Sequence, residues 1–326
     1  MKRHIFFLFT LIIIAILTGC TSSRSYFEPE STPLKEHTLQ GSGTDKILLI
    51  PVSGFISDKR QQEFLRTEPS LVQEIVSHLH KAERDPSVKA VVLKIDSPGG
   101  TVTASDILYN EIVDFKNRTG LLVVVSMMDV AASGAYYISL PADHIVAHPT
   151  SITGSIGVIF IQPKVTGLMD KIGVTFDVSK SGDKKDMGSP LRQSTEEEQQ
   201  IMQDLTEQLG QRFLDLVVQH RELGGSQLDN VSSGRVYLAD EALRLGLVDS
   251  VGYLGDALEE ARNLAELPQK AKVVVYRRDS YPDDNLYNTA TVQESGRGFQ
   301  VVNLELPDSV FYLQTGFYYL WAPGFE

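Results

Sequence analysis

Short apolar runs, separated by glycine-rich turns and amphipathic stretches, constrain the fold of this chain most strongly. Residues 46–54, 88–95 and 121–126 are runs of strand length dominated by Val, Leu and Ile. Apolar residues at helical spacing follow the first two runs, over 69–84 and 103–116. Strands with apolar residues on both faces are buried on both sides, as in parallel sheets covered by helices. The alternation therefore predicts an α/β domain with a mostly parallel sheet and flanking helices.

The most regular helical pattern lies further along the chain. A fourth apolar run, at 144–147, predicts another strand, and residues 194–222 predict a long helix. Thr195 and Glu198 form a capping box at its start. A stripe this regular predicts a core or a subunit contact rather than a site. The stripe consists of Ile201, Leu205, Leu209, Phe213, Leu216 and Val217.

The N-terminus has the pattern of an export signal. A basic stretch at 1–4 precedes an apolar run at 5–17, which is shorter than the about 20 residues that cross a bilayer. The sequence Leu17-Thr-Gly-Cys20 resembles the lipobox of bacterial lipoproteins. This resemblance implies a signal peptide at 1–19, lipidation of Cys20 and cleavage before it. The alternatives are an ordinary cleaved signal peptide and an uncleaved anchor.

Composition bounds the location and the partners. Residues 20–45 are rich in Ser, Thr, Glu, Pro and Gly, and they predict a flexible linker behind the lipid. Cleavage would remove Lys2 and Arg3, so the net charge of −12 would become −14. An acidic chain without a basic stripe excludes a nucleic-acid partner, and the seven histidines form no metal-binding motif. We therefore expect no metal or cofactor. If Cys20 is lipidated, Thr21 in the following position, where Asp is absent, favours sorting to the outer membrane in a diderm organism.

The C-terminal part differs in character. Residues 46–270 are expected to form the main globular domain, and 271–326 an extension of unknown role. Within the extension, 273–276 predict a strand and 279–298 a polar loop. The end, at 317–321, is strongly aromatic. It is expected to pack on its own domain, with a partner or a membrane as the alternative.

Ser133 is the first residue with a chemical setting. It follows the strand at 121–126 and lies between Ala132 and Gly134, within a predicted helix at 131–140. Small neighbours let a substrate backbone approach, and a helix start supplies free N–H groups near developing negative charge. A serine nucleophile is one interpretation. A helix N-cap is the other.

The segment Asp96-Ser-Pro-Gly-Gly100 is the second candidate element. Two glycines after a buried strand expose backbone N–H groups in a concave turn, which is how an oxyanion hole forms without side chains. The alternative is a plain turn between a strand and a helix.

A lysine base and a hydroxyl that orients it complete the set. A lysine with the usual pKa of about 10.4 is protonated at neutral pH, so a catalytic lysine needs burial or a nearby cation to lower its pKa. Lys184 and Lys185 are both candidates, and a solvated basic turn is the alternative. In Thr153-Gly-Ser-Ile-Gly157, the Ser155 hydroxyl could hold a neutral amine, unless it serves only the loop.

Taken in order, these segments resemble the signal peptide peptidase A family, also called protease IV. The resemblance covers about 46–265 and matches the short form, with one domain of the ClpP/crotonase-like fold. The matching stretches are Asp96-Ser-Pro-Gly-Gly, Ala131-Ala-Ser-Gly-Ala-Tyr-Tyr, Thr153-Gly-Ser-Ile-Gly-Val, Lys180-Ser-Gly-Asp-Lys-Lys-Asp with Ser189-Pro, and Gly234-Arg-Val-Tyr.

The resemblance implies a Ser/Lys dyad. It makes Ser133 the nucleophile and Lys185, rather than the preceding lysine, the general base. It makes Ser155 the hydroxyl that orients the amine, and Gly100 and Gly134 the oxyanion donors. It also implies a homo-oligomeric ring in which neighbouring subunits contribute the serine and the lysine.

The chain departs from the family pattern in three places. Ala135 stands where relatives usually have a second glycine, the lipobox replaces a transmembrane anchor, and the resemblance is silent beyond 271. The sequence still predicts a lipid-anchored serine endopeptidase of the cell envelope, with signal peptides or other unfolded apolar peptides as substrates. A crotonase-like acyl-thioester enzyme and a non-catalytic oligomeric scaffold are the alternatives.

Overall fold

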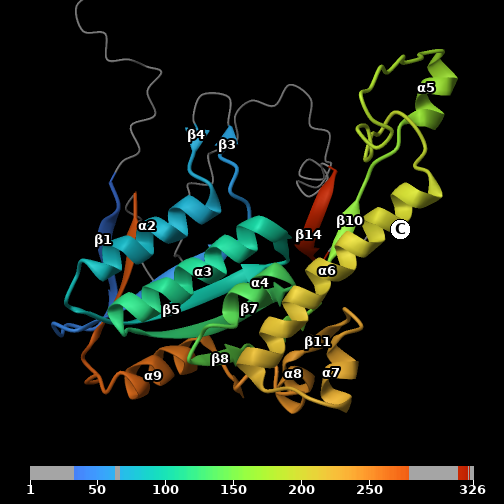
Figure 1. The fold of residues 1–326 in the computed structure, drawn as a ribbon. Coiled ribbons are helices and arrows are strands. Elements are labelled where there is room, and N and C mark those ends of the chain that lie inside the picture. Colours follow the sequence, from blue (N-terminus) through green and yellow to red (C-terminus); the bar gives the residue numbers. More distant parts are fainter. Residues whose placement is uncertain (1–32, 63–66, 279–314, 322, 324–326) are drawn as a thin grey trace, which may run out of the picture.

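A computed structural model describes residues 33–62, 67–278, 315–321 and 323 (Figure 1). The main sheet runs in the order β1-β13-β2-β5-β7-β8-β12, and the pair β9-β11 branches from β7. All contacts between neighbouring strands from β13 to β12 are parallel. The α/β class with a mostly parallel sheet is therefore confirmed. The strands are β1 (Lys35–Gln40), β13 (Lys272–Arg277), β2 (Lys46–Ser53), β5 (Val88–Ser97), β7 (Leu122–Ala132), β8 (His144–Ala147), β12 (Ser250–Val251), β9 (Ile152–Gly154) and β11 (Val236–Leu238).

Helices cover both faces of this sheet. The helices α2 (Leu71–Glu83), α3 (Val102–Thr119) and α4 (Gly134–Ser139) lie on one face, and α9 (Leu254–Leu264) lies on the other (Figure 1). Alternate residues of each strand serve the two cores. In β2, Leu48 and Ile50 join the core under α2 and α3, whereas Ile47 and Leu49 join the core under α9. Burial on both faces explains why the strands read as continuous apolar runs.

Two strands at one edge lie outside the expected limits of the domain. Residues 35–40 fall in the predicted linker, yet they form β1 and pair antiparallel with β13. In turn, β13 pairs with β2, so the sheet extends past residue 270, where the domain was expected to end. The sequence of β1 is polar and mostly exposed, and backbone pairing holds it there. Apolar periodicity cannot detect a strand of that kind.

The long helix α6 (Glu196–Arg221) forms as predicted, with both halves of the capping box at Thr195. It ends at Glu222, which has a φ of 52°, three residues before Gly225. Of the apolar stripe, only Phe213 and Val217 are fully buried, while Leu205 is 38% exposed. The stripe therefore contributes to the core at its C-terminal half and is uncovered toward its start. Two short helices follow, α7 (Ser226–Val231) and α8 (Ala239–Arg244).

A second, three-stranded sheet joins distant parts of the chain. It has the order β10-β14-β6, with β10 at Ile159–Ile161, β14 at Gly316–Leu320 and β6 at Gly99–Thr101. Both pairings are antiparallel. The aromatic end thus packs on its own domain, as expected. A short hairpin, β3 (Gln61–Gln62) with β4 (Thr67–Glu68), is also present.

An arm formed by residues 162–195 projects from the body beyond β10 and returns to the start of α6 (Figure 1). It contains the helix α5 (Thr166–Ile172). Among the described residues, no helix is long and apolar enough to cross a membrane. The predicted signal peptide, Cys20 and the polar segment at 279–298 lie outside the described residues.

Candidate active site

Ser133 lies at the junction of β7 and α4 in a strained backbone conformation. Its φ of 55° and ψ of −115° fall outside the regions that residues with a Cβ prefer. A conformation of this kind costs about 1–3 kcal/mol. Two hydrogen bonds hold it, from the Ser133 N–H to the Gly154 carbonyl at 2.7 Å and from the Tyr137 N–H to the Ser133 carbonyl at 2.9 Å.

The Ser133 hydroxyl is buried and unsatisfied. The residue is 1% exposed, and its Oγ has no hydrogen-bond partner among the described residues. Its side chain does not cap α4, so the alternative interpretation as an N-cap by the hydroxyl is wrong. The predicted helix at 131–140 is also shorter than expected, because Ala131 and Ala132 extend β7. A buried hydroxyl left without a partner on a strained turn is typical of a functional position.

The glycines proposed as oxyanion donors lie against one another. An ideal Cβ on Gly134 would stand 3.2 Å from the Gly100 nitrogen and 2.4 Å from Ser105 Oγ. An ideal Cβ on Gly99 would stand 2.7 Å from the Gly134 nitrogen, and Gly99 has a φ of +102°. Only glycine fits at these places. The backbones of β6 and of the start of α4 therefore meet directly beside Ser133. The sequence predicted Gly99 only as part of the glycine turn, and it predicted no role for Ser105.

Ser155 lies next to Ser133 because their strands pair. Strand β9 runs parallel to β7, with Gly154 opposite Ala132, so each serine directly follows a paired residue. Ser155 has a φ of 50°, is 9% exposed and donates its N–H to the Arg235 carbonyl at 2.9 Å. Two serines in a rare backbone conformation thus stand at the ends of adjacent strands.

Lys185 lies apart from this group, in the arm. It is exposed, and no described hydrogen bond joins it to Ser133. The preceding residue, Lys184, forms an ion pair with Glu197 at 2.5 Å. A single copy of the chain thus brings together Ser133, Ser155 and the glycines, but not the lysine.

Arg192 fixes the segment that carries Lys185 to the start of α6. Its guanidinium donates to Asp186 at 2.7 and 2.8 Å and to Glu198 at 2.5 and 2.7 Å. Hydrogen bonds from Arg192 lower the pKa of Glu198 to about 2 and hold the pKa of Asp186 well below its usual value. Both carboxylates therefore stay charged at neutral pH, and this ion-pair network orders the loop around Lys185.

The arm also exposes a group of large apolar side chains. Leu168 is 59% exposed, Ile172 63% and Phe176 55%. Val174 and Val178 extend this apolar surface. Several exposed apolar side chains on one short segment are typical of a surface that contacts another protein.

Ala135, which departs from the family pattern, is fully buried and belongs to the main core. Its carbonyl accepts a hydrogen bond from Ser139 Oγ at 2.7 Å. The added methyl therefore packs inside the protein and does not crowd the surface beside Ser133.

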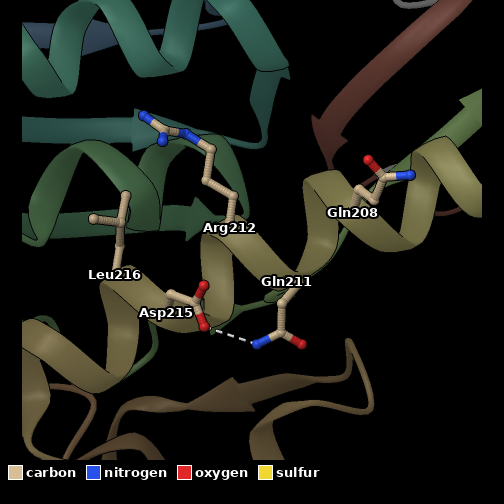
Figure 2. A pocket seen from close by; sticks show the side chains of 5 residues that line it. All are labelled: Gln208, Gln211, Arg212, Asp215 and Leu216. Carbon is tan, nitrogen blue, oxygen red and sulfur yellow. Dashed lines mark hydrogen bonds between the residues drawn. The ribbon is translucent and has the colours of Figure 1, made fainter.

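A hollow on the surface of α6 is separate from the candidate site around Ser133. Figure 2 shows that it is lined by Gln208, Gln211, Arg212, Asp215 and Leu216, with a hydrogen bond between Gln211 and Asp215. It contains no nucleophile and lies on a single helix. Among the described residues, no cluster of three or more His, Cys, Asp or Glu side chains is placed to hold a metal ion.

Comparison with known proteins decides the family. The family model described as peptidase family S49 matches residues 116–268. A protein of Enterococcus faecium, provisionally named signal peptide peptidase SppA, is 34% identical over 251 residues, which are 77% of this chain and 72% of that protein. The chain belongs to peptidase family S49. It is therefore a serine peptidase that acts on peptides, and the resemblance seen in the sequence is confirmed.

Two further matches differ in extent. Protease 4 of Haemophilus influenzae is 34% identical over 82% of this S49 chain, which spans 42% of that protein. Among solved structures, the S97A mutant of the 1510-N membrane-bound stomatin-specific protease matches with a TM-score of 0.46 and 13% identity. That match covers 72% of this chain and 98% of the other. Because the TM-score is below 0.5, the fold class rests on the strand order.

Proposed function

We propose that this S49 peptidase uses Ser133 as its nucleophile and Lys185 of a neighbouring copy as its general base. One observation carries the proposal. The Ser133 hydroxyl is buried without a partner beside the amides of Gly100 and Gly134, while Lys185 stands on an exposed arm. Ser133 of one copy and Lys185 of its neighbour would therefore complete one active site together.

The surface of the chain supports assembly. The arm that carries Lys185 exposes Leu168, Ile172 and Phe176, and the apolar stripe of α6 is uncovered near Leu205. Contact with a second copy would bury these apolar side chains. It would also bury the lysine, and burial lowers the pKa of an amine toward neutrality. The same contact would therefore deliver the base and activate it. We infer a ring of identical copies in which each junction forms one active site.

The chemistry follows from the groups present. The neutral Lys185 amine takes the proton of the Ser133 hydroxyl while Oγ attacks the peptide carbonyl. The N–H groups of Gly100 and Gly134 stabilise the oxyanion, and the lysine then gives its proton to the leaving amine. Water, deprotonated by the same amine, releases the acyl-enzyme. Ser155, which directly follows the adjacent strand β9, would orient the incoming amine.

The substrates we propose are signal peptides or other unfolded apolar peptides of the cell envelope. The assembled protein is expected to hydrolyse an unfolded apolar peptide and to leave an acyl-coenzyme A thioester intact, since the chain belongs to a peptidase family. Mass spectrometry of the products measures both reactions. Thioester hydrolysis without peptide hydrolysis would favour the crotonase-like alternative, and inertness toward both would favour the scaffold.

For the location, we propose a lipid anchor on Cys20. In a diderm organism the anchor would hold the chain on the periplasmic face of the outer membrane. The mature protein is expected to begin at an acylated Cys20, which mass spectrometry of its N-terminal peptide detects. Cys20→Ala should yield a protein that washes off the membrane. An unmodified Cys20, or a different first residue, would contradict the anchor.

A further inference from the structure

The segment Gly234-Arg-Val-Tyr237 belongs to the family resemblance, yet no step of the proposed reaction falls to it. The structure places most of it in β11, which pairs antiparallel with β9. The register sets Val236 opposite Gly154 and Tyr237 opposite Thr153. Strand β9 in turn pairs with β7, whose last residue precedes Ser133. The candidate site thus lies at the ends of β7 and β9, and β11 is the next strand outward.

Two backbone hydrogen bonds connect the two serines of the site to this outer part of the sheet. The Ser133 N–H donates to the Gly154 carbonyl at 2.7 Å. The residue after this glycine, Ser155, donates its N–H to the Arg235 carbonyl of the segment at 2.9 Å. Gly154 has a φ of +88°, beside the positive φ values of the two serines. Strained backbone of this kind persists only where its surroundings hold it, so both serines depend on the position of Gly154.

The ring of Tyr237 lies directly against the main chain at Gly154. An ideal Cβ on this glycine would stand 2.6 Å from Cδ2 of the ring and 3.0 Å from Cε2. The contact therefore leaves no room for even a methyl group. Tyr237 is 2% exposed, and closely packed interiors transmit a displacement to their neighbours. A shift of the ring would consequently let the Gly154 carbonyl move, and with it the Ser133 N–H.

Groups of two short helices hold the ring in place. The Tyr237 hydroxyl donates to the carbonyl of Asn230, in α7, at 2.8 Å. The Arg235 guanidinium lies 4.6 Å from the ring centroid, where a cation is attracted by the aromatic face. That guanidinium also donates to Glu241, in α8, at 2.5 Å. Figure 1 shows α7 and α8 beside β11. The ring is thus fixed from the side of α7 and α8 and presses on the turn that carries Gly154.

We propose that Tyr237 is a positioning residue of the peptidase, which sets the Ser133 nucleophile and the Ser155 hydroxyl through Gly154. A misplacement of about 1 Å in a reacting group can cost about 100-fold in rate. Loss of the ring should therefore lower kcat, while the strength of peptide binding is retained. The inference rests on the proposed function, because it takes Ser133 as the nucleophile and Ser155 as the hydroxyl that orients the lysine.

The experiment measures kcat and KM for an unfolded apolar peptide on folded, assembled variants of the intact chain. Tyr237→Leu removes the ring beside Gly154 and is expected to lower kcat about 100-fold, with KM within about threefold of wild type. Tyr237→Phe keeps the ring and should retain kcat within about threefold of wild type, which separates support by the ring from any need for the hydroxyl.

A matched control is available at the other side of the sheet. Tyr276 is also a fully buried tyrosine, but it lies in β13, which β2 and β5 separate from β7. Tyr276→Leu makes the same change in a core position and should lower the Tm as Tyr237→Leu does. Its kcat is expected to stay within about threefold of wild type, because the loss of a buried ring alone does not move the serines.

A folded Tyr237→Leu protein with wild-type kcat would overturn the inference, and so would an equal loss of kcat in Tyr276→Leu. If Tyr237→Leu does not fold, Gly154→Ala tests the same contact from the other side. The added methyl would push the main chain away from the ring, so kcat should fall about 100-fold with KM retained. An unchanged kcat in Gly154→Ala would overturn the inference. These outcomes leave the proposed function intact, whereas full activity of Ser133→Ala would overturn both.

Discussion

Replacement of Ser133 by alanine is expected to lower kcat for peptide hydrolysis by at least about 10⁴-fold and to leave the protein folded. The substitution removes the attacking oxygen but keeps the backbone at φ 55°, since alanine and serine carry the same Cβ. It also removes a buried hydroxyl that has no partner among the described residues. Relief of that unsatisfied group should raise the free energy of unfolding by about 1 kcal/mol. Lost activity with retained or increased stability distinguishes a nucleophile from a structural serine.

A matched control lies on the same strand. Ser126 is also buried, in β7, but lies away from α4 and the glycines. Ser126→Ala is expected to keep activity within about threefold of wild type. Peptide assays and thermal unfolding of the three proteins give the comparison. A Ser133→Ala protein that hydrolyses peptides at the wild-type rate would remove Ser133 from the mechanism.

Lys185→Ala should be as inactive as Ser133→Ala, yet a mixture of the two should regain activity. If each site forms at a junction, half of the copies in an equal mixture supply an intact serine and half an intact lysine. Random assembly then restores about one quarter of the wild-type activity, half multiplied by half. Activity is measured after the two purified variants are dissociated together, mixed and reassembled.

The neighbouring lysine supplies the control for this experiment. Lys184 is engaged with Glu197, and Lys184→Ala is expected to stay active by itself. A mixture of Ser133→Ala with the double variant Ser133→Ala/Lys185→Ala should remain inactive, because no copy has the serine. If the mixture of the two single variants also stays inactive while both remain assembled, the serine and the lysine act within one copy, and the shared site is wrong.

The sequence predicted the main sheet well because its strands are buried on both faces. Burial of that kind leaves runs such as Ile47–Val52, which are visible without knowledge of the partners. The edge strand β1 left no such signal, because its contribution is backbone pairing with a strand more than 230 residues away. Strand β13 was expected as a strand, but no local pattern could place it inside the main sheet.

The candidate site was predictable in part for a similar reason. Gly100, Gly134 and Ser155 follow strands that pair in the sheet, and the structure brings all three close to Ser133. Within one copy, Lys185 lies apart from these residues. Residue spacing could not predict this separation, because it does not say which copy of the chain supplies the lysine. The aromatic end was expected to pack on its own domain. Its entry between β6 and β10 depends on non-local pairing that composition does not encode.

The Ser133 hydroxyl has no hydrogen-bond partner among the described residues of one copy, and this has a consequence for when the peptidase is active. If Ser133 and Lys185 of two different copies form each site, a single copy is inactive. It has the attacking oxygen but no base to deprotonate it. Dilute copies would then not cleave the unfolded proteins around them. Activity per copy would rise steeply with the local concentration of the chain, because only assembled copies would have a complete site.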